Sequence, residues 1–193
     1  MSTEILPGML TTITVYLSLL DIPVIIPPED PKLFERYGLG WESFHKIGCG
    51  DCHRQSLSIT DSKLKITDKL TVDLFLDGEE PRPRQDVFYD FGTPIFLFSD
   101  LRFHSMGAEL AESRATVAGV PADVFLTRSL WGVADTGPYL HDGRAITLDD
   151  AILAHGGEGK AARDAYVALS STDKANVRVF LLSLTRHPRI EYR

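Results

Sequence analysis

The sequence has few cysteines, no long apolar run and no excess of basic residues. Two of the 193 residues are cysteine, which excludes a scaffold held together by several disulfides. The most apolar stretch, residues 9–20, includes several hydroxyl side chains and is shorter than the roughly 18 apolar residues that suggest a membrane helix. The formal net charge of −7 argues against binding nucleic acid, which needs a clustered basic surface. We therefore expect a chain that does not span a membrane and has no nucleic-acid partner.

The composition that remains is that of a folded globular protein. Apolar residues make up 44% of the chain and charged residues 24%, within the ordinary range for globular domains. The length fits one domain with an additional arm, since domains most often contain about 100 to 150 residues. Four prolines between residues 21 and 31 favour an extended connector. We expect an N-terminal helix and Pro-rich linker over residues 1–30 and one domain over residues 31–193.

Apolar residues at helical spacing indicate several short helices. Near the C-terminus, Thr147 with Asp150 and Ser170 with Asp173 have the spacing of helix N-caps. The predicted helices span residues 4–20, about 39–47, 147–154, 158–169 and 170–184.

One segment has the period of a strand instead. Residues 69–78 (KLTVDLFLDG) alternate apolar and polar side chains and end at Asp77–Gly78, which predicts a strand or hairpin in an arm over residues 56–95. Residues 85–120 are expected to be mostly irregular. The predicted fold is therefore mainly α, with short helices, long loops and a small β arm.

Both cysteines lie in one short motif, GCGDCHRQ at residues 48–55, and His53 directly follows the second. Cys-x-x-Cys-His is the attachment sequence of c-type haem. On one helical turn, the thiols of Cys49 and Cys52 can each form a thioether with a haem vinyl group, and His53 can supply an imidazole to the iron. We predict one covalently bound haem c in a cytochrome c-like domain.

Three other interpretations of the motif are a disulfide, a thioredoxin-like redox pair and half of a zinc site. A zinc site would need a second pair of ligands, and the sequence holds no further cysteine. A redox pair would be expected in a βαβ context, whereas Cys49 follows a predicted helix and precedes a loop. Haem attachment is the interpretation that the motif favours.

Haem attachment also predicts a cellular compartment. Haem c is attached outside the cytoplasm, so we expect a periplasmic or equivalent location, with both thiols consumed by thioethers. Residues 9–20 make a poor secretory signal, because no Lys or Arg precedes them and no small-x-small cleavage site follows. The chain is therefore expected to be a processed product or an excised part of a longer protein.

Three segments carry a resemblance to a known family: FHKIGCGDCH (44–53), LFSDLRFHSMGAELA (97–111) and the block 129–184. They resemble the C-terminal haem domain of the di-haem oxidoreductases, described as peroxidases or thiol oxidoreductases and related to bacterial di-haem cytochrome c peroxidases. The resemblance covers nearly all of residues 36–185, with gaps in 56–95. It implies a redox partner that is a second haem domain or another protein. Family members carry two haem motifs and this sequence carries one, so it is similar to half of such an enzyme.

A six-coordinate haem iron needs a second axial ligand, and the sequence offers Met106 and several histidines. The spacing along the chain favours Met106, because small cytochromes carry a distal methionine well after the haem motif. The resemblance favours His155, which lies where the related peroxidases carry a distal Met or Tyr, whereas Met106 lies where they carry Ile. Gly156 and Gly157 follow His155 and would let the backbone approach a flat macrocycle. His155 is the predicted ligand, with Met106 and an open iron as alternatives.

Other residues are candidates for the surroundings of the haem. His141 is expected either to line the haem edge or only to brace the turn at Asp142–Gly143, and Arg144 either to pair with a haem propionate or to be solvated. His104 is expected to be a satisfied structural histidine, and His45 to be exposed. The apolar wall of the haem pocket is expected to include Trp131, Tyr139, Leu130, Phe44, Ile47 and Pro138.

Three functions are consistent with these features. The first is an electron-transfer domain whose haem is ligated by His53 and His155. The second is a peroxidase-type enzyme with an open distal site, in which His141 or His155 acts as acid or base. The third is a haem-stabilised subunit that docks into a larger redox assembly through the arm at residues 56–95.

Overall fold

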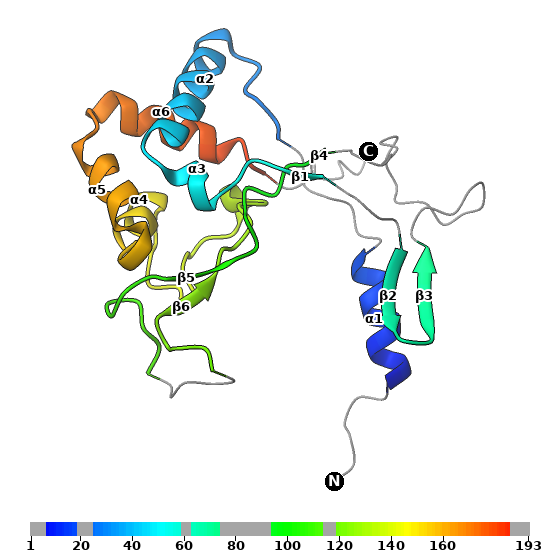
Figure 1. The fold of residues 1–193 in the computed structure, drawn as a ribbon. Coiled ribbons are helices and arrows are strands. Elements are labelled where there is room, and N and C mark those ends of the chain that lie inside the picture. Colours follow the sequence, from blue (N-terminus) through cyan, green and yellow to red (C-terminus); the bar gives the residue numbers. More distant parts are fainter. Residues whose placement is uncertain (1–6, 19–24, 59–62, 74–93, 114–118, 186–193) are drawn as a thin grey trace. The chain divides into compact units, whose positions relative to one another are not determined.

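A computed structural model describes residues 7–18, 25–58, 63–73, 94–113 and 119–185. Its backbone contacts divide the chain into an arm unit, made of Met1–Ile22 and Ser58–Ile95, and a helical unit, made of Pro23–Leu57 and Phe96–Arg193. The fold is mainly α with a small β arm, as the sequence predicts (Figure 1). Within the described ranges, every helix is too short or too polar to cross a bilayer.

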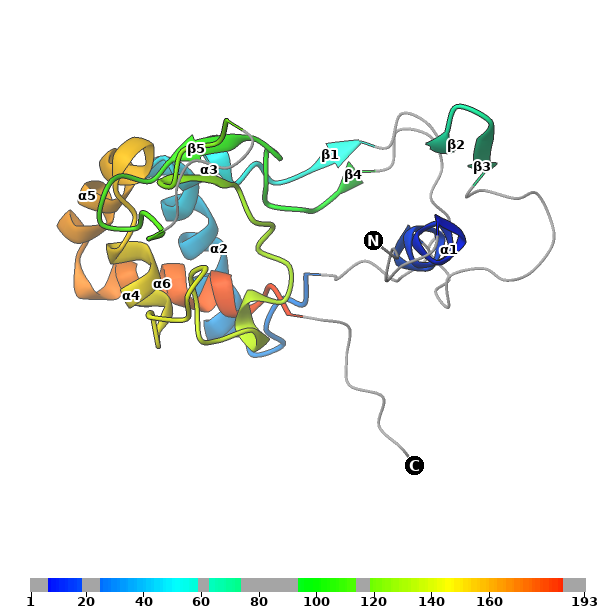
Figure 2. The ribbon, with the colours of Figure 1, turned by 90° about the horizontal axis from the view of Figure 1, so that it is seen from below.

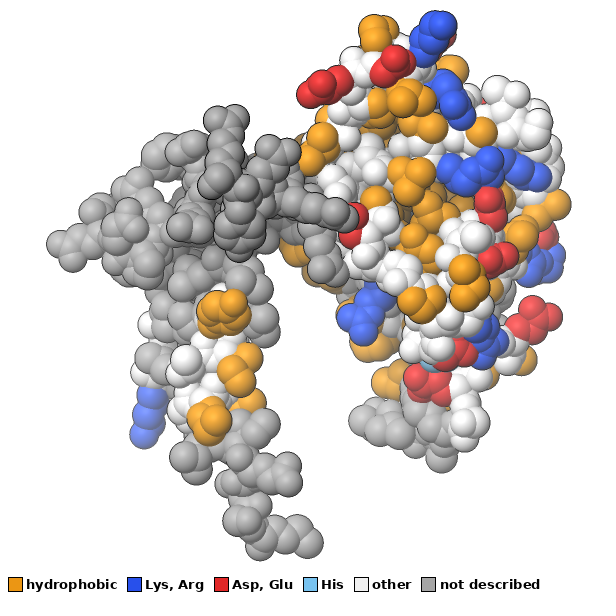
Figure 3. Space-filling view, turned by 180° about the vertical axis from the view of Figure 1, so that it is seen from behind, with side chains coloured by type: hydrophobic (Ala, Val, Ile, Leu, Met, Phe, Trp, Pro, Cys, Tyr) orange, Lys and Arg blue, Asp and Glu red, His pale blue; other side chains and the backbone are white. Residues whose placement is uncertain are grey.

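The arm unit contains helix α1 (Pro7–Ser18) and a hairpin of β2 (Lys63–Thr67) and β3 (Leu70–Asp73). The two strands pair antiparallel. Helix α1 and strand β3 confirm, for their described parts, the helix predicted over 4–20 and the strand predicted over 69–78. The predicted turn at Asp77–Gly78 lies outside the described residues. Apolar side chains of α1 lie exposed on its surface (Figure 3): Met9, Leu10, Ile13 and Tyr16.

Two further pairs of very short strands occur. Strand β1 (Leu57–Ser58) pairs with β4 (Pro94–Ile95), and β5 (Phe103–Ser105) pairs with β6 (Val124–Leu126). Strand β6 was not predicted, because three residues are too few to display an alternating pattern. The described part of residues 85–120 is otherwise largely irregular, as predicted.

Helix α2 (Pro31–Lys46) begins well before its predicted start near residue 39. The carboxylate of Asp30 accepts hydrogen bonds from the backbone N–H groups of Lys32 and Leu33, at 2.9 and 3.0 Å. Pro31 opens the helix, where its missing N–H costs nothing and its fixed φ is already helical. Residues 31–38, for which no helix was predicted, therefore belong to α2, because Asp30–Pro31 is here a helix N-terminus.

Helix α2 packs closely against α6 (Ser171–Leu182) in the helical unit (Figures 1 and 2). The closest approach is at Gly40, where an added Cβ would lie 2.0 Å from the carbonyl oxygen of Asn176. The Asn176 side chain in turn accepts a hydrogen bond from Arg36 Nε at 3.0 Å. The absence of a side chain at Gly40 is thus what lets the two backbones approach.

Three phenylalanines form the centre of the core. The ring centroid of Phe180 in α6 lies 5.2 Å from that of Phe44 in α2 and 5.7 Å from that of Phe98. Each is at most 3% exposed, and full burial of such a side chain contributes roughly 1.5–3 kcal/mol. Phe98 belongs to an irregular segment, yet its ring fixes that segment against two helices.

The C-terminal helices follow the prediction. Helix α4 (Leu148–Leu153) begins with the predicted capping box, in which Thr147 and Asp150 each bond the other's backbone N–H, and Ser170 caps α6. A short 3-10 turn, η2 (Gly157–Gly159), leads into α5 (Lys160–Ala168). Asp149 of α4 accepts hydrogen bonds from Tyr166 in α5 and Arg178 in α6. This carboxylate ties together the three helices around His155.

Candidate haem site

Cys49 and Cys52 begin and end the single-turn helix α3 (Cys49–Cys52), which follows α2 directly. The His53 N–H donates to the Cys49 carbonyl at 2.9 Å, so the motif forms one closed helical turn. Burial raises the pKa of the Cys49 thiol to about 12, and burial together with nearby carboxylates raises the pKa of the Cys52 thiol. Reactive redox pairs have a lowered thiol pKa. The environment of these thiols therefore argues against a thioredoxin-like role.

His53 is held with one ring nitrogen toward the core. Its Nδ1 lies 2.9 Å from the carbonyl oxygen of Phe98. A carbonyl only accepts hydrogen bonds, so Nδ1 carries the proton and Nε2 presents a lone pair. No described residue gives Nε2 a hydrogen-bond partner. Burial lowers the pKa of His53 to about 4, so the ring is neutral at pH 7.

His155 has the same arrangement. It follows the end of α4, and its Nδ1 lies 2.7 Å from the carbonyl oxygen of Ala151, one turn earlier. Burial lowers its pKa as well, and Nε2 has no hydrogen-bond partner among the described residues. His155 also lies close enough to His53 to lower the pKa of His53 electrostatically. The helical unit thus holds two neutral imidazoles, each with an Nε2 that has no hydrogen-bond partner among the described residues.

Met106, the alternative ligand, lies beside His155. A Cβ added at Gly159 would be 3.3 Å from both Met106 Cε and His155 Cβ. Both predicted ligands therefore belong to the same part of the helical unit. Only His155 also has a hydrogen bond that fixes its tautomer.

In this structure the two glycines after His155 allow a close approach to another part of the backbone, and not to the macrocycle for which they were predicted. A Cβ at Gly157 would lie 2.2 Å from the Ser105 carbonyl oxygen, and one at Gly156 would lie 2.6 Å from the Met106 carbonyl oxygen. Gly157 also has φ of 47°, a conformation that residues with a Cβ rarely adopt. These glycines let the turn after His155 lie against the backbone of the 105–107 segment, which was not foreseen.

His104, expected to be a satisfied structural histidine, lies between two carboxylates. Its Nε2 is 2.9 Å from Asp100 Oδ2 and its Nδ1 is 2.8 Å from Glu158 Oε2. The hydrogen bonds to Glu158 and Asp100 raise the pKa of His104. Burial raises the pKa of Asp100, but hydrogen bonds from the Arg102 N–H, His104 and Thr127 outweigh it and bring that pKa to about 2. Both ring nitrogens are occupied, so His104 is not free to ligate iron.

The His104 cluster predicts a pH-dependent stability. His104 stabilises the fold below its ordinary pKa of 6.5, and this contribution is lost as pH rises through its raised pKa. Asp100 and Glu158 stabilise it above their ordinary pKa values of 3.8 and 4.5, and lose this as pH falls. In urea unfolding, His104→Gln should therefore lower the free energy of unfolding most, relative to the wild type, between pH 4.5 and 6.5. The difference should shrink at alkaline pH, once His104 has lost its proton; a difference that stays constant with pH would contradict the assignment.

His141 and Arg144 lie in the turn before α4. The His141 ring stacks on Phe125 of β6, with centroids 4.7 Å apart. Arg144 pairs with Asp142 at 2.5 Å and donates from Nη1 to the Glu109 carbonyl oxygen at 2.8 Å. In this structure Arg144 ties the turn to the segment that carries Met106, so binding a propionate would require it to leave those partners.

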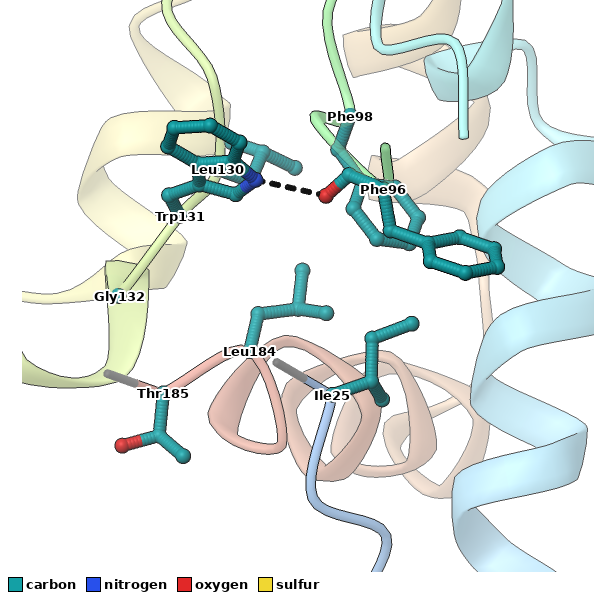
Figure 4. Close-up of a pocket in the computed structure, with 8 residues that line it drawn as sticks. All are labelled: Ile25, Phe96, Phe98, Leu130, Trp131, Gly132, Leu184 and Thr185. Atoms are coloured by element: carbon teal, nitrogen blue, oxygen red, sulfur yellow. Dashed lines mark hydrogen bonds between the residues drawn. The ribbon is translucent and has the colours of Figure 1, made fainter. Parts of the chain in front are cut away.

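Trp131 and Tyr139 belong to the packing around the core. Trp131 donates from its indole N–H to the Phe96 carbonyl oxygen at 2.8 Å, and Tyr139 donates from its hydroxyl to Val133 at 3.0 Å. Trp131 borders a small hollow (Figure 4) lined by Ile25, Phe96, Phe98, Leu130, Trp131, Gly132, Leu184 and Thr185. Its volume of about 10 Å³ suits a single water molecule, so it is not a haem pocket.

Two other parts of the predicted surroundings differ from expectation. His45 was expected to be exposed and is half-buried: its ring packs on Trp41, with centroids 4.5 Å apart, and Gly50 lies against it. Pro138, expected in the apolar wall, is exposed, whereas Phe44 and Ile47 are buried. His187 lies outside the described residues.

A helical domain that presents a Cys-x-x-Cys-His turn and a second half-buried imidazole has the features of a haem redox protein. A family model described as "Di-haem oxidoreductase, putative peroxidase" matches residues 35–184. Because this match covers most of the chain, the protein belongs to that family. No curated protein and no solved structure matches the chain.

Membership in a di-haem family implies a haem cofactor, and the donor set fits one. Haem iron accepts neutral imidazole nitrogens, and His53 and His155 both offer Nε2 with Nδ1 bonded to a backbone carbonyl. Cys49 and Cys52 are free thiols at the two ends of one turn. The thiols lie in α3, the imidazoles just after α3 and α4, and the buried phenylalanines in α2, in α6 and at Phe98.

Proposed function

We propose that this protein is a c-type haem electron-transfer domain of the di-haem oxidoreductase family. The observation that carries the proposal is the matched pair of imidazoles. His53 and His155 each have Nδ1 fixed on a backbone carbonyl and a lowered pKa, and no residue in the described ranges is hydrogen-bonded to either Nε2. This is the arrangement in which a histidine binds a metal through Nε2.

Each residue has a defined role in this proposal. Cys49 and Cys52 form thioethers to one haem, and His53 and His155 are its axial ligands. The Phe98 carbonyl and the Ala151 carbonyl orient the two imidazoles. When bound, the haem supplies an iron that accepts or donates one electron. The Phe44 ring lies beside His53, and the buried rings of Phe98 and Phe180 pack on Phe44 and keep water from that side.

Electron transfer is favoured over peroxidase chemistry by the state of the nearby histidines. A peroxidase-type site needs an open iron and a free acid or base beside it. His104, the histidine beside Cys52, has both ring nitrogens engaged by carboxylates, and this proposal assigns His155 to the iron. The ferric protein should therefore be low-spin and unchanged by peroxide. A high-spin spectrum that responds to peroxide would favour the enzyme.

The test of the proposal is covalent haem attachment. The protein would be produced in a host able to mature c-type cytochromes, and its intact mass measured after denaturation. We expect a mass increase of one haem, retained under denaturing conditions and lost when Cys49 and Cys52 are both replaced by alanine. His45→Ala is the matched control, because this histidine lies next to the motif but has no proposed ligand role. A colourless protein with two free thiols would refute the proposal.

One observation favours a second candidate, a metal site without haem. Ligand atoms of Cys52, Asp100 and His104 lie within 4.8 Å of one another, and cysteine, histidine and carboxylate are zinc ligands. The mass measurement separates the two candidates. A zinc site would leave both thiols unmodified and yield stoichiometric zinc by elemental analysis, whereas thioether formation removes Cys52 from such a set.

The proposal has consequences for location and partners. Attachment of haem c places the protein in the periplasm or an equivalent extracytoplasmic space. One haem can only pass electrons between two other centres, so a second haem domain or a separate redox protein is required as partner. Docking into a larger assembly is compatible with the same role.

A further inference from the structure

The side chains of His104 and Glu158 join the segment after Phe98 to the turn after His155. His104 is 18% exposed and lies between Asp100 Oδ2 and Glu158 Oε2, at 2.9 and 2.8 Å. A protonated His104 donates to both carboxylates. Hydrogen bonds between charged groups are roughly twice as strong as neutral ones. The Asp100 side chain is 6% exposed and that of Glu158 is 56% exposed, so water screens the bond to Glu158 more than the bond to Asp100.

Glu158 uses its second oxygen on the backbone. Its Oε1 accepts a hydrogen bond from the Ser105 N–H at 2.9 Å. Glu158 lies in η2, only three residues after His155, and the preceding Gly157 packs tightly against the Ser105 carbonyl. One carboxylate therefore holds the turn after His155 to both the side chain and the backbone of β5.

The other end of the same segment reaches the proximal side. Phe98, two residues before Asp100, supplies the carbonyl that orients His53. The Cys52 sulfur lies within 4.8 Å of the ligand atoms of Asp100 and His104. Residues 98–105 thus contact the haem motif at one end and the turn after His155 at the other.

We propose that His104 and Glu158 are positioning residues, which hold the turn carrying His155 at a fixed place relative to His53. The inference rests on the proposed function, because it concerns the second axial ligand. Neither residue is a ligand itself. Their role is to keep the imidazole of His155 available to iron against competition from small external ligands.

The test compares matched variants of the haem-loaded protein. Glu158→Ala removes the contacts to His104 and Ser105 together, while Glu158→Gln keeps an amide oxygen for the Ser105 N–H. Ser105→Ala is the control, because it removes the side-chain bond to Asp123, which precedes β6, but leaves the backbone contact to Glu158. Ferric spectra and cyanide or imidazole titrations are the readouts.

A positioning role predicts a graded result. Glu158→Ala should bind cyanide about 10- to 100-fold more tightly than the wild type, since loss of outer contacts typically changes a metal site by that factor. It should also show a partly high-spin ferric spectrum. Glu158→Gln should be intermediate, and Ser105→Ala should match the wild type. A purely structural contact would lower unfolding stability without moving these spectra.

The outcomes separate the two proposals. If Glu158→Ala carries covalent haem and keeps the wild-type spectrum and cyanide affinity, the positioning role is wrong and the proposed function stands. If the wild type itself carries no haem, the proposed function fails first. Should Glu158→Ala not fold, His104→Gln decides, because one amide group cannot replace both hydrogen bonds that the imidazole makes to Asp100 and Glu158. An unaltered spectrum would again overturn the inference.

Discussion

Replacing His155 with alanine is expected to convert the ferric haem from low-spin to high-spin, whereas Met106→Ala leaves it low-spin. The reason is that a hydrogen bond fixes the tautomer of His155 and leaves one ring nitrogen free to bind, whereas Met106 has no such bond among the described residues. His155 has its Nδ1 fixed by the Ala151 carbonyl at 2.7 Å, so Nε2 is ready to bind iron. Met106 lies beside His155 and fills space next to Gly159. Loss of an axial imidazole leaves the iron five-coordinate or bound to water.

Optical spectra of the two purified variants, each with covalent haem verified by mass, check this prediction. Added imidazole should restore the low-spin spectrum of His155→Ala, because the free ligand can occupy the place of the lost ring. The wild type should bind imidazole far more weakly. If Met106→Ala becomes high-spin while His155→Ala does not, the ligand assignment is reversed. If the wild type is already high-spin, the electron-transfer function is refuted.

The haem motif could be found from the sequence because its chemistry is local. Cys49, Cys52 and His53 are contiguous, so one helical turn brings them together whatever the rest of the chain does. His155 was predicted from a family resemblance and from its place after a capped helix. Its proximity to His53 depends on how α4 and the Phe98 segment pack, which no local pattern encodes.

The His104 cluster could not have been predicted in the same way. Its carboxylates come from Asp100, in an irregular loop, and from Glu158, in a turn more than fifty residues further along the chain. A histidine with both nitrogens bonded was expected, but its partners were not. A signal was present in hindsight: Gly156 and Gly157 indicate a close backbone approach, and the segment they approach carries His104.

The start of α2 was missed for a different reason. The Asp30–Pro31 pair is a strong helix N-terminus signal, but it follows three other prolines and was interpreted as part of the same connector. The early part of this helix places Tyr37 against Phe180 and brings Gly40 to the contact with α6. The packing that supports the haem motif therefore begins in residues 31–38, where no helix was predicted.

The Gly40 contact leads to the second large prediction, that Gly40→Ala destabilises the protein by about 3 kcal/mol or more. The new methyl group would lie 2.0 Å from the Asn176 carbonyl oxygen and 3.0 Å from Phe180 Cβ. Neither neighbour can yield cheaply, because one is helix backbone and the other is fixed in the core. The two helices must separate, and the Phe44–Phe180 contact loosens with them.

Gly38→Ala is the matched control, since it lies in the same helix with no atom within 4 Å of an added Cβ. Alanine has a higher helix propensity than glycine, so this variant should gain up to about 1 kcal/mol. Urea unfolding of the wild type and both variants, followed by far-ultraviolet circular dichroism, measures the difference. Opposite shifts of the midpoint at unchanged slope are expected. Equal midpoints for the two variants would mean that α2 and α6 do not pack at Gly40. The packing of α2, which carries the Phe44 ring beside His53, would then be wrong as well.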